Sequence, residues 1–419
     1  MPKATPGANY VIVKGDTLWG IAGQAYGNVR RWPEIWNANK GTLSSGDPNL
    51  IFPGEVILIP GEKPLVIDVE EDSELLPGPE VDPTGVILTI DGQEVKVEAA
   101  RVLRTMDTGS DRWSAEVYWD PNDAELTELY RAYKYKEAKM YVGGQLLVTG
   151  PLMVSEPAVT SDKVSMSLEG FSTTIDMVDS HLNPPYQYNE MTLNQIANEL
   201  ASHRGITVVD ETPALGTFKR ITAERSDKEF DFLAKLAKQK GVLLTSTPKG
   251  YLLITKTAEE KDTFGSIGDD QARGHDWRAR FDGRQRFRQY RVIGKRRGKN
   301  VNSITVVDDV VPKSRTLNIS AGDLVGAELE QAANWEKSKR IADALTIPFP
   351  VSDWYAPDER LWRENKYVTV VSARIFVPQG FDFLIRSVEY IYGPDGRKSI
   401  LSLVPPGVFT GEKVEEPWL

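Results

Sequence analysis

The side chains that could carry out catalysis are carboxylates, because other reactive types are scarce. The 419 residues include 60 Asp and Glu, three His and no Cys. Without Cys there is no thiol nucleophile, disulfide framework or cysteine-ligated metal. The histidines, His181, His203 and His275, lack the HExxH spacing of a zinc enzyme and do not favour a serine–histidine triad. We predict no catalytic residue, no metal and no cofactor.

Carboxylates alone can cleave a glycosidic bond when a general acid and its partner lie ~5–9.5 Å apart. No segment matches a lysozyme or transglycosylase pattern, and the sequence has no GxxxxGK[ST] or GxSxG motif. Gly92, Gly143 and Gly144 stand in hairpin-turn contexts, which gives little support to a nucleotide site. We predict that the chain is not an enzyme, and a cell-wall hydrolase is the catalytic alternative.

The densest charged stretch runs from Arg273 to Lys299, where eleven Lys and Arg stand against two Asp, a net charge of +9. Interleaved aromatic residues suit phosphate and base contacts. Arg284, Arg286 and Arg288 also alternate with Gln and Phe, as on one face of a strand. Since the whole chain carries a net charge of −10, we predict protein or intersubunit contact and no specific nucleic-acid binding. The predicted basic surface comprises Arg278, Arg280, Arg284, Arg286, Arg288 and Arg291.

The composition is that of a globular, multidomain chain. Hydrophobic residues make up 40% and charged residues 26%, enough apolar material for several cores, and the length suggests roughly two to four domains. No run of 18 apolar residues occurs, so we expect no spanning helix and no membrane anchor. The first ten residues lack the apolar segment of a signal peptide, so we expect synthesis in the cytoplasm.

Residues 10–60 have the pattern of a small β-α-α-β module. Tyr10–Val13 reads as a strand, and Gly15 allows a turn before a helix whose cap is Asp16 or Thr17. A second short helix fits 33–39, and a closing strand fits 55–59. The first helix has one apolar face, formed by Leu18, Ile21, Ala22 and Ala25.

With Gly15-Asp16-Thr17-Leu18, Trp36-Asn37 and Pro53-Gly54 at these spacings, the module closely resembles a LysM domain. LysM domains commonly bind N-acetylglucosamine polymers such as peptidoglycan or chitin. The resemblance implies a groove with Gly15, Asp16, Thr17 and Leu18 on one side and Asn49, Leu50 and Ile51 on the other. The same residue types also serve the turn, the cap and the core, so sugar binding and protein docking both stay open.

Residues 61–84 change character. Between 61 and 83, eight acidic residues stand against one Lys, and four prolines interrupt the stretch. Because like charges repel and proline resists helix formation, we predict an extended linker. The alternative is an acidic strap that lies against the basic surface.

From Gly85 onward, alternating apolar residues predict mainly strands in a small barrel or sandwich, with hairpin turns at Asp91-Gly92 and Gly143-Gly144. A helix is predicted over 120–139, with an apolar face formed by Leu126, Leu129, Tyr130 and Tyr133. Residues 190–256 read as α/β, with capping-box spacing at Thr192/Gln195 and Ser226/Glu229. A helix over 327–346 and strands over 366–404 complete the chain.

Residues 168–179 with 192–197, and 226–241 with 250–252, resemble the baseplate hub proteins of contractile phage tails. These are the Mu-type hub and late control protein D group, with the hub part of type VI secretion spikes as a more distant relative. The resemblance spans roughly 86–408, and the order of its short motifs is its strongest feature. Phe171 stands where many relatives have arginine.

The predicted fold class is multidomain α+β, mainly β: a LysM module followed by two β-barrel-like domains with an α/β insert. The predicted ranges are 1–60 for the LysM domain, 61–84 for the acidic, Pro-rich linker, 85–189 for the first hub barrel-like domain, 190–262 for the insert, 263–410 for the second barrel-like domain and 411–419 for a C-terminal tail.

The hub resemblance implies a structural protein of the virion tail baseplate. It would form a homotrimeric ring that joins the tail tube to a central spike. The implied partners are the tube protein, the spike protein and wedge or sheath-initiating proteins, with the LysM module docking on these neighbours or on peptidoglycan. The alternative is a peptidoglycan-binding tail-associated protein or a cell-wall hydrolase.

Overall fold

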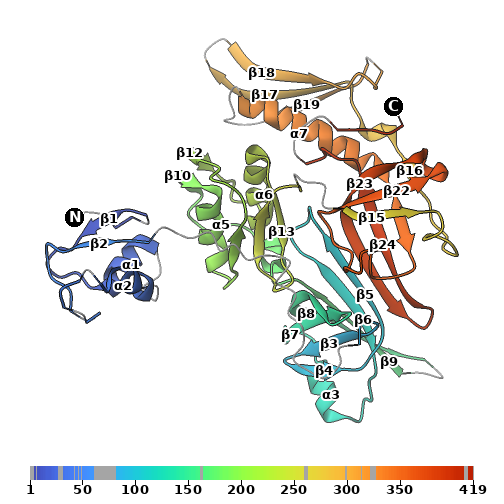
Figure 1. Ribbon diagram of the computed structural model, residues 1–419, viewed down its shortest axis with the longest axis horizontal. Helices are drawn as coiled ribbons and strands as arrows, with labels where there is room; N and C mark the ends of the chain where they lie inside the picture. The colour runs from blue at the N-terminus through green and yellow to red at the C-terminus, as the bar shows by residue number, and fades with distance from the viewer. Residues whose placement is uncertain are drawn as a thin grey trace. The chain divides into compact units, whose positions relative to one another are not determined.

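The computed structural model describes residues 4–5, 7–26, 32–41, 43–45, 47–48, 50–60, 82–160, 164–258, 263–297, 300–312, 314–320, 327–409 and 414–418. The chain divides into two compact units, Met1–Val66 and Ile67–Leu419, which are described separately below (Figure 1). Of the predicted linker, residues 61–81 lie outside the described residues, and so does the predicted acidic strap.

The first unit has the predicted β-α-α-β order, which is confirmed. Its elements are β1 (Asn9–Val11), α1 (Leu18–Tyr26), α2 (Trp32–Asn39) and β2 (Val56–Leu58). The two strands are antiparallel, and Tyr10 faces Ile57 above a core closed by the helices. Asn39 is buried, but its amide donates to the carbonyls of Ile35 and Leu58, each at 2.7 Å, and accepts from the Leu58 N–H at 2.8 Å. These bonds attach α2 to β2 and satisfy a polar group in the core.

The second unit is built on one large sheet. Twelve strands of the described residues form it, in the order β15-β22-β23-β5-β6-β9-β8-β7-β3-β4, with β24 and β21 attached through β23. Seven strands come from the first part of this unit: β3 (Val86–Ile90), β4 (Gln93–Val95), β5 (Val97–Thr105), β6 (Arg112–Val117), β7 (Glu137–Val142), β8 (Gln145–Val159) and β9 (Val164–Phe171). Five come from the last part: β15 (Thr263–Gly268), β21 (Pro348–Val351), β22 (Tyr367–Ser372), β23 (Val377–Gly393) and β24 (Gly396–Val404).

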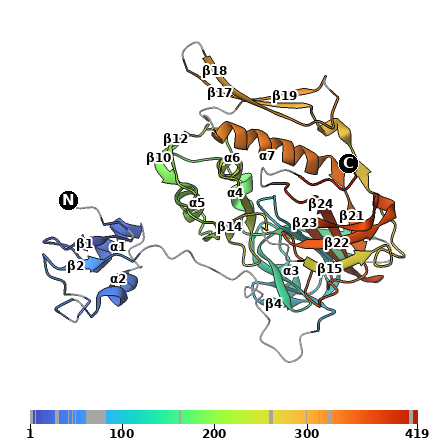
Figure 2. The same ribbon diagram turned by 45° about the horizontal axis from the view of Figure 1, so that its top comes forward.

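The pairing of β5 with β23 joins these two parts. The strands are antiparallel, with Thr105 opposite Ser387 and Ala100 opposite Tyr392. The two β-rich regions, which the sequence presents as separate, therefore share one hydrogen-bonded sheet (Figures 1 and 2).

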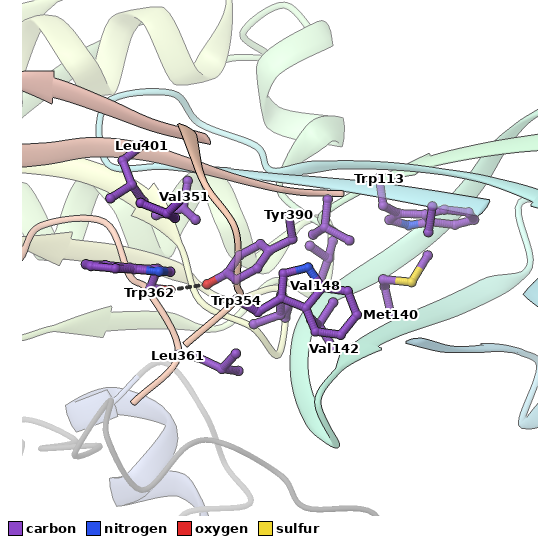
Figure 3. Close-up of a cluster of buried hydrophobic side chains, with 14 of the residues drawn as sticks. Trp113, Met140, Val142, Val148, Val351, Trp354, Leu361, Trp362, Tyr390 and Leu401 are labelled. Carbon is purple, nitrogen blue, oxygen red and sulfur yellow. Dashed lines mark hydrogen bonds between the residues drawn. The ribbon is translucent and has the colours of Figure 1, made fainter. Parts of the chain in front are cut away.

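The two parts also share one apolar core (Figure 3). Trp113 on β6 and Tyr390 on β23 are fully buried in it, and the Tyr390 hydroxyl donates to the Trp362 carbonyl. Gly170 on β9 makes room for the first of these rings, because a Cβ at that position would lie 2.5 Å from Trp113. The mainly β fold class is thus confirmed.

An α/β insert separates the two β-rich parts in the sequence. Its elements are α4 (Ile175–Asp179), β10 (Gln187–Thr192), α5 (Leu193–Ser202), β11 (Val208–Asp210), β12 (Thr217–Thr222), α6 (Glu229–Lys240), β13 (Leu243–Ser246) and β14 (Leu252–Thr255). The capping box of Thr192 and Gln195 forms as predicted. The one predicted at Ser226 and Glu229 is wrong, since α6 begins without a side-chain cap and Glu229 is buried against Arg204 at 2.7 Å.

A smaller layer contains β16 (Arg280–Phe281), β17 (Gln289–Arg297), β18 (Asn300–Val307), β19 (Thr316–Ser320), α7 (Ala327–Asp343) and β20 (Leu345–Thr346). The sheet β18-β17-β19 lies along α7, and Val292 packs there against Leu329 and Ala333 (Figure 2). In the described parts of the chain, no helix combines the length and apolar character needed to span a membrane.

The helix predicted over 120–139 is wrong in its length. Only α3 (Ala124–Leu129) forms, capped by the Asp123 carboxylate, which accepts from two backbone N–H groups. Tyr133 has a left-handed φ of +62°, which a right-handed helix cannot include, and from Glu137 onward the chain pairs as β7 with β3 and β8. Tyr133, predicted on the apolar face, is 84% exposed.

Candidate functional site

The first side of the predicted LysM groove is a closed turn. Gly15 has a φ of +99°, and the Asp16 carboxylate accepts from the Val13 N–H and the Tyr10 hydroxyl, each at 2.9 Å. Thr17 is the residue that caps α1, because its hydroxyl accepts from the Gly20 N–H at 3.0 Å. Burial raises the pKa of Tyr10, and the hydrogen bond and charge of Asp16 raise it further. With Leu18 buried in the core, these side chains hold the turn in shape.

The second side of the groove is a fastened loop. Asn49 lies outside the described residues, Leu50 is 49% exposed, and Ile51 packs on the core of the unit. The Glu55 carboxylate accepts from the backbone N–H groups of Ser44, at 2.9 Å, and Phe52, at 2.8 Å. The hydroxyl and amide of Ser44, together with the amide of Phe52, lower the pKa of Glu55.

Backbone bonds bring the two sides to the same end of the unit. The Gly54 N–H donates to the Ile12 carbonyl at 2.8 Å, and the Ile12 N–H donates to the Glu55 carbonyl at 2.9 Å. These bonds join the chain just before Gly15 to the chain just after Ile51. The groove predicted from the sequence therefore has adjacent sides.

Two aromatic side chains at this end were missed in the sequence analysis. Trp19 is 59% exposed and Phe52 is 44% exposed. The signal for Trp19 is its position one residue after Leu18, off the apolar face of α1. Exposed aromatic rings provide flat surfaces on which a sugar or an apolar side chain can pack.

Only some of the arginines of the predicted basic surface are exposed to solvent. Arg286 is half-buried and donates to Asp308, at 2.8 and 3.1 Å, and to Glu416, at 2.6 and 3.1 Å. Burial alone would lower the pKa of Arg286, but these two carboxylates raise it. Arg288 is also half-buried and pairs with Asp309 at 2.7 Å. Including these two arginines in an exposed surface is therefore wrong, and Arg286 instead fastens the C-terminal segment.

The other arginines of this stretch stay exposed. Arg280 and Arg284 both donate to Asp282 at 2.6 Å, and the bonds from Arg284 and Arg280 hold the pKa of that carboxyl far below its usual range. Arg278 and Arg291 are exposed. The strand alternation predicted over 284–288 is wrong, because 283–285 form a 3-10 turn and β17 begins at Gln289. The side chains of 295–299 lie outside the described residues.

A buried ionic cluster, which no sequence pattern predicts, joins three parts of the second unit. Arg104 on β5 is 3% exposed and donates to Glu364, at 2.6 and 3.0 Å, and to the Leu147 carbonyl at 2.6 Å. Asp111 accepts from the Thr105 N–H at 3.0 Å and from the Ser246 hydroxyl of the insert at 2.7 Å. The available signal was strand parity, because Arg104 follows Ala100 and Val102 on the buried face of β5.

The two carboxylates of the cluster lie at different distances from the guanidinium of Arg104. Arg104 contacts Glu364 directly but lies 3.8 Å from Asp111. Burial raises the pKa of Asp111 to about 6 despite the nearby Arg104, whereas Arg104 overcomes the burial of Glu364 and lowers its pKa. The cluster is sealed from solvent and so serves as a joint between the sheet and the insert. Among the described residues, no group of three His, Asp or Glu side chains could hold a metal ion.

Three family models match parts of the chain. Residues 10–60 match the LysM domain. Residues 174–256 match the second domain of gp44-like baseplate hub proteins. Residues 326–412 match the fourth domain of the Mu phage baseplate assembly protein GpP.

The chain is also similar to whole phage and prophage tail proteins. Baseplate hub protein gp44 of Escherichia phage Mu is 26% identical over 288 residues, which are 64% of this chain and 75% of gp44. The 43 kDa tail protein of prophage MuSo2 from Shewanella oneidensis has a TM-score of 0.67 and 25% identity, covering 78% of this chain and 99% of that one. A tail protein from Neisseria meningitidis MC58 shares the fold, with a TM-score of 0.68 and 17% identity, over 78% of this chain and 98% of its own.

Proposed function

We propose that this chain, a LysM domain joined to domains of the Mu-type baseplate hub, is the structural baseplate hub of a contractile phage-type tail. The observation that carries the proposal is the similarity to gp44, which spans most of the gp44 chain. Two family models named for Mu-type baseplate proteins also match the chain, over residues 174–256 and 326–412. The structural alignment with the tail protein of MuSo2 covers 99% of that chain and 78% of this one.

The hub works by assembly. Three copies form a ring in the virion baseplate that joins the tail tube above to the spike below, and wedge or sheath-initiating proteins surround it. A cyclic ring needs two different surfaces on each copy that fit one another. The continuous sheet supports this role, because strands from both parts of the second unit are hydrogen-bonded to one another in it. Within this proposal we keep the domain ranges 1–60, 61–84, 85–189, 190–262, 263–410 and 411–419.

The function proposed for the hub involves no catalysis. Two carboxylates whose pKa values burial and Arg104 displace, Asp111 and Glu364, lie in the joint between the sheet and the insert, where Asp111 is buried and Glu364 is 10% exposed. Asp282 is half-buried, and its carboxylate is paired with two arginines. A hydrolase would instead need two carboxyl groups facing a cleft. We expect a purified sample to leave a cell-wall suspension turbid at every pH from 4 to 8.

The ring predicts the mass of the purified protein. At micromolar concentration, light scattering coupled to size-exclusion chromatography should give three times the monomer mass of 46.7 kDa. Tails purified from producing cells should contain the chain together with tube and spike proteins. A monomer at every concentration, combined with absence of the chain from purified tails, would overturn the proposal.

The LysM groove is proposed to hold the tail against cell-wall glycan, because Trp19, Leu50 and Phe52 present exposed apolar surface at the groove end. The full chain should pellet with peptidoglycan. Leu50→Ala should lower the bound fraction about tenfold, as expected when one packed side chain contributes about 1.4 kcal/mol. Val56→Ala is the matched control, since Val56 is 55% exposed on the outer face of β2 and should leave pelleting unchanged. Equal pelleting of all three proteins would assign the module to protein docking.

A further inference from the structure

The three-stranded sheet β18-β17-β19 has two open edges (Figure 2). Both outer strands are hydrogen-bonded to β17, and within the described parts of the chain neither of them pairs with another strand. An open edge presents a row of unpaired N–H and C=O groups, which can pair with a strand of another chain. Folded proteins protect such edges by short strands, charges, proline, bulges or a covering element.

The other strand edges of this chain are protected in these ways. β1, β2, β4 and β11 have three residues each, and β16 and β20 have two. β21 contains Pro348 and Pro350, and β15 is interrupted by a bulge beside Gly265, whose φ is +90°. β12 carries Lys219 and Arg220, β10 carries an acidic residue, and β13 is buried along its length.

The strands β18 and β19 lack this protection. β18 has eight residues and β19 has five, and neither contains a charged residue, Pro or Gly. Five of the eight residues of β18 are Val, Ile or Thr, which favour strand pairing. At the end of β18 the Lys337 ammonium already donates to the Val307 carbonyl at 2.9 Å, so the open part is 300–306. The contrast with the protected edges indicates that these two edges are kept open for a partner.

The strand directions and the two faces of the sheet fit a second copy. β17 is antiparallel to β18 and parallel to β19, so β18 and β19 run in opposite directions. A copy related by rotation about an axis along the strands therefore brings its β19 antiparallel to β18. Ile304, Val306 and Ile319 pack toward α7, whereas Thr305 and Asn318 are exposed. A sheet joined in this way keeps its apolar residues on one face and its polar residues on the other.

We propose that the β18 edge of one copy pairs antiparallel with the β19 edge of a second copy of this chain, at each contact between neighbours in the hub ring. This inference deepens the proposed hub function and rests on it. Each copy offers one edge of each kind, so the contact is head-to-tail, which is the type that generates a ring. Main-chain hydrogen bonds between the two edges supply the affinity.

Disulfide cross-linking tests the pairing, because the natural chain has no Cys. Asn318→Cys is combined in turn with Ser303→Cys, Thr305→Cys or Val307→Cys in the full-length chain, which samples three registers. Within one copy, Thr305 and Asn318 stand opposite the same β17 residue, Arg291. Two strand spacings, about 9.6 Å, separate them, which is too far for a disulfide bond. A disulfide between these positions therefore has to join two copies.

Mild oxidation of purified tails that contain the double variants should give covalent dimers and trimers of the chain in at least one register. A reducing agent should return them to monomers. The single variants Thr305→Cys and Asn318→Cys are the matched controls and should stay monomeric, because a head-to-tail contact brings together one position from each edge. Before oxidation, the double variants should unfold at the wild-type urea concentration, since the substituted side chains are exposed.

Three results would contradict the pairing and leave the hub function intact. They are the absence of covalent multimers in all three registers, cross-linking of Thr305→Cys to itself, and cross-linking of the chain to a different tail protein in place of a second copy. Absence of the wild-type chain from purified tails would instead overturn both the pairing and the hub function.

Discussion

Arg104→Met should lower the free energy of unfolding of the second unit by about 3–5 kcal/mol, the cost of leaving a buried charge without its partner. The guanidinium is the positive group at the centre of a cluster with two carboxylates, Glu364 and Asp111. Met fills a similar volume but brings no charge. The second Glu364 oxygen already has no hydrogen-bond partner among the described residues, so that carboxylate would lose its main compensation. Urea unfolding at pH 7.5, followed by tryptophan fluorescence, measures the loss.

Arg101→Met is the matched control for this effect. Arg101 lies on the same strand, β5, but on its outer face, where its side chain is 65% exposed and pairs with Glu389 at 3.3 Å. An exposed pair of this kind contributes about 0–1 kcal/mol. Equal losses for the two variants would mean that the buried cluster contributes no more than a surface ion pair, and the joint would have to be assigned elsewhere.

Asp111→Asn should stabilise the second unit at neutral pH by on the order of 2–3 kcal/mol, because it removes a surplus buried negative charge. Arg104 and Glu364 balance each other, and Asp111 is the third charge of the cluster. Asn keeps the geometry, since its carbonyl can accept from the Thr105 N–H and its amide can donate to the Ser246 hydroxyl. Denaturant unfolding at pH 7.5 is the measurement.

The stabilisation by Asn should shrink as the pH falls. Burial raises the pKa of Asp111 to about 6, above its usual value of 3.8, so the folded chain binds this proton more tightly than the unfolded chain. The stability penalty of the ionised carboxylate is present above pH 6 and is relieved as the pH falls below it. Between pH 7.5 and pH 5 the advantage of Asn should drop by on the order of 1 kcal/mol. A constant advantage across this range would contradict the raised pKa.

Local chemistry made the turns and helix ends of this chain predictable. Asp91-Gly92 adopts left-handed angles of +50° and +80° between β3 and β4, as a tight hairpin turn requires. Thr17 caps α1, and Gly241 ends α6 with a φ of +66°. Each of these features depends on residues within a few positions of one another. The β-α-α-β order of the first unit was predictable for the same reason, together with the family resemblance.

Features that depend on distant residues were not predictable in this way. The sequence pattern placed Arg286 on the exposed face of a basic strand. In the structure it pairs with Asp308 and Glu416, which lie far along the chain. The apolar spacing around Tyr133 is that of a helix. The residues that follow it form β7 instead, because they pair with β3 and β8. Arg104 was hidden because its charge balance needs residues from three separate segments.

The pairing of β5 with β23 has a consequence for how the polypeptide is made. Thr105 finds its neighbour Ser387 only after most of the chain has left the ribosome. Until β23 has been synthesised, the backbone groups on one edge of β5 lack their hydrogen-bond partners. Unpaired strand edges of this kind can pair with other chains and cause aggregation. We expect fragments that stop before Val377 to aggregate when expressed, so that only polypeptides translated nearly to the end are available for tail construction.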